Sequence, residues 1–291
     1  MKSRRDFIKQ ASLLIAGGVV APQLISSCGG GKPSKALGLQ LYSLRDMVKE
    51  EGIQKVLETV APMGYKYLEP ASYSDGKLYG LAPADLKKRC DDLGLKLVSS
   101  HLSRNISDDH DADMAWWNRA VDAHNEAGMK YMIMPSAPLR GEGATIDNIK
   151  RYGDYFNEIG LITAGASITF GYHNHNFEFD NKIEGTPVYD LLLQSTSPSH
   201  VVFQLDVYWI KIGGFEPVDY MKKYSNRIRV LHIKDETAIG AQNTVDYKAV
   251  FDEAYAIGIK DWFVEVERYD TTPTEDIQKS ADFLNAAPYV K

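Results

Sequence analysis

The sequence predicts a single-domain α/β fold, a (β/α)8 TIM barrel over residues 37–291, from three observations. Short apolar runs alternate with longer amphipathic segments from Leu37 onward, eight of each. This alternation is typical of a parallel sheet, and eight parallel strands close a barrel. The chain has 291 residues, 44% of them hydrophobic and 25% charged, as a single globular barrel of roughly 250 residues requires. No Gly-x-Gly-x-x-Gly motif follows the first run, which disfavours a doubly wound dinucleotide-binding sheet.

The apolar runs predict the strands, and the residues typical of helix ends predict the bounds of the helices between them. Gly64 and Gly128 each directly follow an amphipathic segment, where glycine commonly ends a helix, and Pro83 suits a first helical turn. The expected strands are residues 37–42, 65–69, 95–100, 130–134, 167–173, 201–206, 228–233 and 262–267. The helices expected after each strand are residues 53–63, 83–93, 112–127, 146–164, 188–195, 217–224, 247–257 and 274–286.

The N-terminus predicts an export signal over residues 1–28. Arg4 and Arg5 precede a short apolar stretch, a pattern that resembles a twin-arginine signal. The run LISSC then resembles a bacterial lipobox, with Cys28 as the residue to be acylated, and residues 29–36 follow as a flexible tether. We therefore expect an exported protein on the periplasmic side, held at a membrane only through an N-terminal lipid anchor. The alternative is an ordinary cleaved signal peptide with an incidental cysteine.

Charge and cysteine content exclude some partners. The net charge is −6 and no basic stripe is present, so no nucleic-acid partner is expected. Cys90 is the one cysteine besides Cys28, so we expect no disulfide framework. Cys90 falls in an amphipathic segment and is interpreted as a buried apolar side chain. The sequence leaves a homo-oligomer open.

Polar residues fall where the expected strands end. In a barrel, the carboxyl ends of the strands meet at one rim, which is where functional groups lie. His173 and His175 are two residues apart, so on a strand both side chains leave the same face. The alternative is a polar rim without a metal. The residues that carry this pattern are Glu69, His101, His173, His175, Asp206, His232 and Glu265.

The residue types at this rim predict one divalent metal ion. Carboxylates with imidazoles favour Mn, Mg, Co, Fe or Zn over copper–thiolate chemistry. Such an ion polarises a carbonyl and makes the neighbouring carbon-bound proton removable, which requires a base within reach. The candidate bases are His175, Glu178 and Glu69, and Lys234 is a candidate for stabilising oxyanion charge. The candidate substrate-binding residues are His101, Glu267 and two aromatic side chains suited to stacking on a sugar, Tyr42 and Trp209.

Four ordered segments resemble the xylose-isomerase-like barrel superfamily of sugar isomerases and epimerases. They are YHNHNFEF from Tyr172, DVYW from Asp206, RIRVLHIKD from Arg227 and FVEVE from Phe263. The resemblance implies a divalent metal held by residues of successive strands, usually Glu, Asp, His and Glu. Carried over to this sequence, the ligands are His173, Asp206, His232 and Glu265, with Glu267 as the alternative to Glu265.

Two departures from that pattern bear on the reaction. His173 stands where the family usually has Glu, which removes one member of the paired-glutamate proton shuttle, and Trp209 stands where ketose epimerases often have His. The His-x-His run is similar to the inosose dehydratase and keto-glycoside lyase branch. We expect a metal-dependent sugar isomerase or epimerase. The alternatives are a lyase or dehydratase acting on keto-sugars or 3-keto-glycosides, and a non-catalytic carbohydrate-binding lipoprotein.

Overall fold

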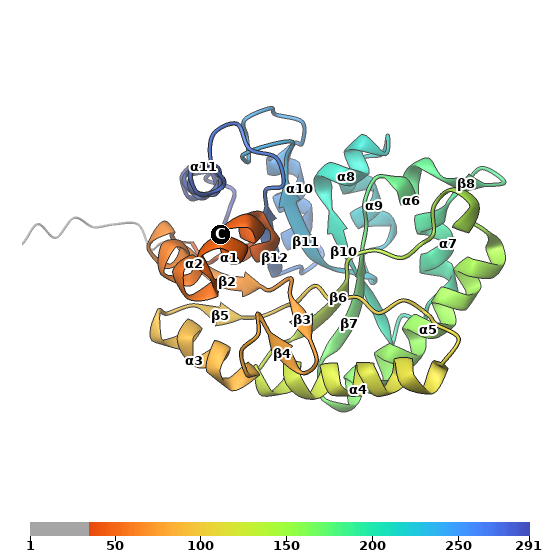
Figure 1. Cartoon of the computed structure of the whole chain (residues 1–291). Coiled ribbons are helices and arrows are strands. Elements are labelled where there is room, and N and C mark those ends of the chain that lie inside the picture. The colour runs from red at the N-terminus through yellow and green to blue at the C-terminus, as the bar shows by residue number, and fades with distance from the viewer. Residues whose placement is uncertain (1–34) are drawn as a thin grey trace, which may run out of the picture. The chain divides into compact units, whose positions relative to one another are not determined.

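The computed structural model describes residues 35–291 (Figure 1). The predicted export signal, Cys28 and most of the predicted tether lie outside the described residues. Lys35, at the end of that tether, already contacts the barrel: its Nζ donates hydrogen bonds to the carbonyl oxygens of Leu284, at 2.9 Å, and Ala287. None of the helices in residues 35–291 is both long and apolar enough to cross a membrane.

The core of the fold is an eight-stranded parallel sheet that curls into a TIM barrel. Its strands are hydrogen-bonded in the order β5-β2-β1-β12-β11-β10-β7-β6. Their bounds are β1 (Leu37–Gln40), β2 (Tyr65–Glu69), β5 (Lys96–Leu97), β6 (Tyr131–Met134), β7 (Thr169–His173), β10 (Val201–Asp206), β11 (Ile228–Lys234) and β12 (Asp261–Glu265). The first and last members of this order are also joined, because Ile133 N donates to Ser100 O at 2.8 Å and Leu102 N donates to Ile133 O at 3.0 Å. The predicted fold class is confirmed.

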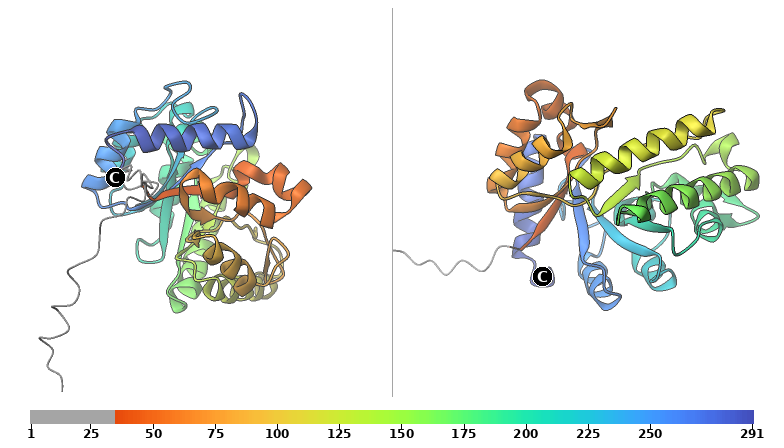
Figure 2. Two further views of the ribbon diagram at one scale, coloured as in Figure 1. Left: turned by 90° about the vertical axis from the view of Figure 1, so that its left-hand side faces the viewer. Right: turned by 90° about the horizontal axis from the view of Figure 1, so that it is seen from below.

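Helices cover the outside of the sheet (Figure 1, Figure 2). This is why strands such as β1 and β6 are buried along their whole length and read as continuous apolar runs. The helices are α1 (Arg45–Glu51), α2 (Ile53–Val60), α3 (Pro83–Asp92), α4 (His110–Glu126), α5 (Ile146–Gly165), α6 (Phe177–Asp180), α7 (Val188–Ser195), α8 (Val207–Ile212), α9 (Pro217–Lys223), α10 (Tyr247–Ala256) and α11 (Pro273–Ala286).

The predicted boundaries agree closely with most elements but not with β5. Strands β2 and β10 and helix α7 have the predicted bounds. The prediction of a strand over residues 95–100 is wrong in extent, because regular pairing ends at Leu97. Beyond it Val98 O accepts from both Lys130 N and Tyr131 N, so the segment bends toward β6 while it closes the barrel. Cys90 is buried in α3, as predicted.

The loops contain elements that the alternation did not predict. Helix α8 begins directly after β10, and helix α6 begins at Phe177, shortly after β7. Two short antiparallel hairpins are formed by β3 (Tyr73–Ser74) with β4 (Lys77–Leu78) and by β8 (Lys182–Ile183) with β9 (Thr186–Pro187). The connections also contain the 3-10 helices η2 (Leu41–Leu44), η3 (Ala61–Met63) and η4 (Gly141–Gly143). Most of these insertions follow the carboxyl ends of strands, where they surround the candidate site.

Candidate metal centre

Four potential ligands meet at the carboxyl ends of four neighbouring strands. His173 ends β7, Asp206 ends β10, His232 lies near the end of β11 and Glu265 ends β12. One nitrogen or oxygen atom of each lies within 4.8 Å of the corresponding atoms of the others, and all four side chains are buried. Ligands bound to one divalent ion at about 2.0–2.2 Å would lie at such separations from one another. The structure thus brings together the four residues that the sequence proposed as ligands.

Asp206 provides a test of whether this group suits a cation. Its Oδ1 caps helix α8 by accepting hydrogen bonds from Tyr208 N at 2.9 Å and Trp209 N at 2.8 Å. Its Oδ2 is buried and has no hydrogen-bond partner among the described residues. Burial raises the pKa of Asp206 to about 7. An unpaired buried carboxylate oxygen is costly, and a cation at Oδ2 would offset that cost, so the donor set fits a divalent metal.

His232 is held between two carboxylates. Its Nε2 donates to Glu69 Oε2 at 2.5 Å, and its Nδ1 lies 3.2 Å from Glu265 Oε2. Burial lowers the pKa of His232, but the two carboxylates outweigh it and raise the pKa to about 10. Metal-binding histidines commonly donate their second ring nitrogen to a carboxylate, which fixes the ring and its tautomer. Glu69 therefore holds His232 so that Nδ1 faces Glu265 and the ligand group.

Beneath the ligands lies an inner polar layer, formed by Gln40, Glu69, Ser99 and Gln204, all fully buried. Both Glu69 oxygens are satisfied in it. Ser99 Oγ and Gln204 Nε2 donate to Oε1 at 2.5 and 2.9 Å, and Gln40 Nε2 donates to Oε2 at 2.8 Å. Burial raises the pKa of Glu69, but the charges of His101 and His232 and the hydrogen bonds from His232 and Ser99 outweigh it and lower the pKa to about 2. Glu69 is therefore a buried carboxylate that remains charged.

Gln204 connects this layer to two histidines. Its amide nitrogen must face Glu69, because a carboxylate only accepts hydrogen bonds, and its oxygen therefore faces the rings. Gln204 Oε1 accepts from His101 Nε2 at 2.7 Å and from His173 Nδ1 at 3.1 Å. His173 thus donates through Nδ1, which leaves Nε2 without a proton and available as a ligand. His101 also stacks on His232, with ring centroids 5.0 Å apart.

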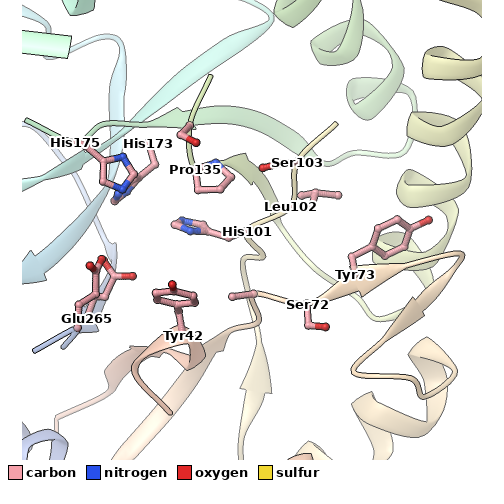
Figure 3. Close-up of a pocket in the computed structure, with 13 residues that line it drawn as sticks. Tyr42, Ser72, Tyr73, His101, Leu102, Ser103, Pro135, His173, His175 and Glu265 are labelled. Carbon is pink, nitrogen blue, oxygen red and sulfur yellow. The ribbon is translucent and has the colours of Figure 1, made fainter. Parts of the chain in front are cut away.

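A cavity of about 540 Å³ opens over the ligand group (Figure 3). His173 and Glu265 lie at one end of it, and Tyr73 lies at the other. Its size is in the range of sites for small molecules. Four further residues that the sequence proposed as catalytic or substrate-binding line this cavity: Tyr42, His101, His175 and Glu267.

His175 is the cavity-lining residue best placed to take up a proton. Its Nδ1 is buried without a hydrogen-bond partner among the described residues, and burial lowers the pKa of His175 to about 4. The ring is therefore neutral at neutral pH and has acceptor capacity. Trp209 lies beside it, with ring centroids 5.9 Å apart, and the indole does not itself line the cavity.

Three residues proposed as catalytic lie behind the cavity wall: Glu69, Glu178 and Lys234. Glu178 accepts from the Tyr172 hydroxyl at 2.6 Å and from His175 N at 2.8 Å, and burial raises the pKa of Glu178 to about 8. Lys234 Nζ lies 3.2 Å from Glu265 Oε2 and 2.8 Å from Glu267 Oε1. These contacts suit residues that position the carboxylates and His175.

Sequence reasoning missed the inner polar layer except for Glu69. Gln204 carries a signal that could have found it, because it interrupts an apolar strand two residues before Asp206 and so shares its inward face. Gln40 and Ser99 also follow apolar residues near strand ends. Their contacts to Glu69, however, depend on which strands are neighbours, which the local sequence does not contain.

Comparison with known proteins finds relatives that are named as a sugar isomerase or epimerase, as the IolI protein and as a dehydratase. A sugar phosphate isomerase/epimerase from Parabacteroides distasonis ATCC 8503 is 37% identical, with a TM-score of 0.81 over 88% of this chain and 100% of that one. The IolI protein, solved with a bound zinc atom, has the same fold, with 18% identity and a TM-score of 0.67 over 88% of this chain and 98% of that one. An inosose dehydratase from Geobacillus kaustophilus (strain HTA426) is 24% identical over 196 residues, which is 62% of this chain and 61% of the relative.

The match to the dehydratase thus spans about three fifths of that protein's length. A family model extends the likeness over most of the barrel. The model described as "Xylose isomerase-like TIM barrel" matches residues 57–287, which include all four ligand strands and the inner polar layer apart from Gln40. The chain therefore belongs to the xylose isomerase-like TIM-barrel family.

Proposed function

We propose that the protein is a divalent-metal-dependent sugar isomerase or epimerase, which removes a proton next to a carbonyl of a sugar or sugar derivative. The observation that carries this proposal is the group of four buried donors beside an open cavity, with Asp206 Oδ2 left unpaired. The family and the names of its relatives support a carbohydrate as the substrate class.

In this proposal each part of the site has a defined task. His173, Asp206, His232 and Glu265 hold the ion, which when bound polarises the substrate carbonyl and favours loss of the adjacent proton. His175 accepts that proton, because its ring lines the cavity and makes no side-chain hydrogen bond within residues 35–291.

Three further residues orient the substrate in this scheme. Tyr42, His101 and Glu267 line the same cavity and can bind sugar hydroxyls. The metal could be Mn, Mg, Co, Fe or Zn, and the zinc bound to IolI favours testing zinc first.

A lyase or dehydratase is the second candidate, favoured by one feature of the site. Epimerisation by two bases needs acceptors on opposite faces of the reacting carbon. The two carboxylates that line the cavity, those of Glu265 and Glu267, are each already paired with Lys234. One unpaired base suffices for an elimination: His175 takes the proton, the C–H electron pair forms the double bond, and a hydroxide or alkoxide leaves the next carbon and takes that proton from His175 to depart as water or an alcohol. The inosose dehydratase relatives agree with this alternative.

Metal analysis and solvent-deuterium exchange test both candidates. We expect about one divalent ion per chain, and loss of that ion in Asp206→Asn and His232→Ala. Epimerisation returns a solvent deuteron to recovered sugar, whereas elimination releases an unsaturated product. A metal-free protein that still binds sugars with full affinity, and exchanges no proton, would instead indicate the non-catalytic carbohydrate-binding alternative.

We also propose that the chain is exported and lipid-anchored through Cys28. The motif around that residue is the support for this proposal. Replacing Cys28 with Ala should move the protein from the membrane fraction to the soluble fraction after osmotic release. Firm membrane association of the Cys28→Ala variant would contradict the anchor.

A further inference from the structure

A second cavity, of about 560 Å³, adjoins the first. It is formed by loops that follow β5, β6 and β7, the same rim of the barrel as the metal centre. Ser136 lines both cavities. Because each cavity falls in the size range of a small-molecule site, the pair offers more room than one sugar ring needs.

A row of rings connects the two cavities. His175, which lines the first cavity, lies 5.1 Å from His173 between ring centroids. His175 also stacks on Phe177, which lines the second cavity, with centroids 5.5 Å apart and planes inclined by 10°. A molecule with one ring near the ligand group could therefore place a second ring near Phe177.

The lining of the second cavity has the composition of a sugar site. The half-buried Phe177 ring presents an apolar aromatic surface, of the kind on which the C–H face of a sugar packs. Around it stand hydrogen-bonding groups: the Asn105 amide, the Ser136 hydroxyl, the Arg140 guanidinium and the Glu142 carboxylate. Within residues 35–291, the Arg140 guanidinium lies 5.4 Å from the Phe177 ring centroid but has no ion pair or hydrogen bond.

The charges of this cavity favour a neutral ligand. Arg140 and Glu142 carry opposite charges and line the same space, so the cavity has no net positive charge with which to select a phosphate or carboxylate. Glu142 likewise has no ion pair or hydrogen bond in the described part of the chain. A hydroxyl can donate to the carboxylate and accept from the guanidinium, so a neutral polyhydroxylated ring satisfies both.

We propose that the second cavity is a subsite for a second sugar ring, and that the substrate is a neutral two-ring glycoside. The reacting ring lies over the ligand group, and the other ring packs against Phe177 in the second cavity, which Arg140 and Glu142 also line. The assignment of the reacting ring rests on the proposed function. The binding of two rings does not, because it follows from the adjoining cavities alone.

Saturation-transfer NMR with the full chain loaded with zinc tests this subsite. The probes are glucose, glucose 6-phosphate, and the disaccharides maltose, cellobiose and sophorose. At least one disaccharide should receive saturation on both rings and bind more tightly than glucose. Phe177→Ala and Arg140→Ala should each weaken disaccharide binding about three- to tenfold while glucose binding is unchanged.

Two variants keep the result interpretable. Phe177→Leu retains the apolar volume without a flat ring, so it should lose disaccharide affinity in a protein of normal stability. Arg229→Ala removes an exposed arginine of β11, outside both cavities, and should change nothing.

Three outcomes would overturn the subsite. They are equal binding of glucose and disaccharides, tighter binding of glucose 6-phosphate through Arg140, and no binding of any disaccharide. Failure of the proposed function looks different, because it would appear as two-ring binding that persists without metal and without proton exchange.

Discussion

The inner polar layer and the ligand group above it are both buried and polar, yet they differ in how their atoms are paired. In the inner layer both Glu69 oxygens accept hydrogen bonds, from side chains of three other strands or strand ends. In the ligand group, Asp206 Oδ2 has no partner within residues 35–291. The neighbouring His175 Nδ1 is also unpaired there.

This difference in pairing distinguishes atoms that stabilise the fold from atoms that are available to bind a ligand. Fully paired buried groups rigidify a fold, whereas an unpaired one costs free energy that a bound ion or substrate can offset. We infer that the inner layer fixes the orientation of the ligands and that the atoms above it are left for the ion and the substrate. Four substitutions test this division.

Asp206→Asn should have the largest effect, because it removes one of the two carboxylates of the ligand group while Oδ1 can still cap α8. Metal affinity should fall by more than about 100-fold, beyond the effect usual for residues that support ligands. Calorimetric titration with zinc measures this change. Without metal at pH about 8, the variant should be at least as stable as the wild type, because ionisation of a buried group with a raised pKa is unfavourable.

Glu69→Gln should have the next largest effect, because it removes the carboxylate that holds His232. We expect metal affinity to fall about 10- to 100-fold, with full stoichiometry at saturation. Stability should fall by about 3 kcal/mol, since one partner of a buried ion pair is lost. Unchanged metal affinity would show that Glu69 does not orient the ligand.

The pH dependence of Glu69→Gln supplies a second readout. The pKa of Glu69 is lowered from 4.5 to about 2, so its stabilising contribution is complete above pH 4.5 and is lost as the pH falls toward 2. The difference in free energy of unfolding between the wild type and the variant should therefore shrink as the pH falls from 4.5 toward 2, as measured by urea unfolding.

Glu178→Gln should show a pH-dependent effect of opposite sign. Burial raises the pKa of Glu178 from 4.5 to about 8, so the wild type loses stability as the pH rises through that range. Glutamine keeps the shape and can donate to the Tyr172 hydroxyl, which removes the ionisation cost. Between pH about 5 and about 9, the free energy of unfolding of the variant, measured in urea, should rise relative to that of the wild type. A difference independent of pH would refute the assignment.

Ser99→Ala should have the smallest effect. It removes one hydrogen bond to Glu69 Oε1, which still accepts from Gln204 Nε2. We expect a loss of about 1 kcal/mol in the free energy of unfolding, and metal affinity within about threefold of the wild type. Unfolding in urea, together with zinc titration, checks both values.

The sequence was sufficient for the barrel because its signals are local. The alternation of apolar runs with amphipathic segments, and the glycines after several helices, lie within each segment itself. The rim ligands could also be proposed, since a histidine or carboxylate at the end of an apolar strand is visible in the sequence.

What escaped prediction depends on contacts between distant segments. The bend at Val98 arises because β5 must reach β6, 30 or more residues later in the chain, to close the barrel. Helix α8 was missed although Asp206 before VYWIKI is a recognisable helix cap, because that aspartate had been assigned as a ligand alone. Its Oδ1 caps helix α8, whereas its Oδ2 is left unpaired in the ligand group.

The shared amide of Gln204 has a consequence for protein engineering. Replacing His173 with Glu, the residue that the family resemblance implies here, would set a carboxylate against Gln204 Oε1, so two acceptors would face each other. Flipping the amide would relieve that clash, but it would then turn the oxygen toward Glu69 and away from the proton of His101. Positions 69, 101, 173 and 204 therefore form one design unit, and a change of metal preference at this centre requires exchanging them as a set.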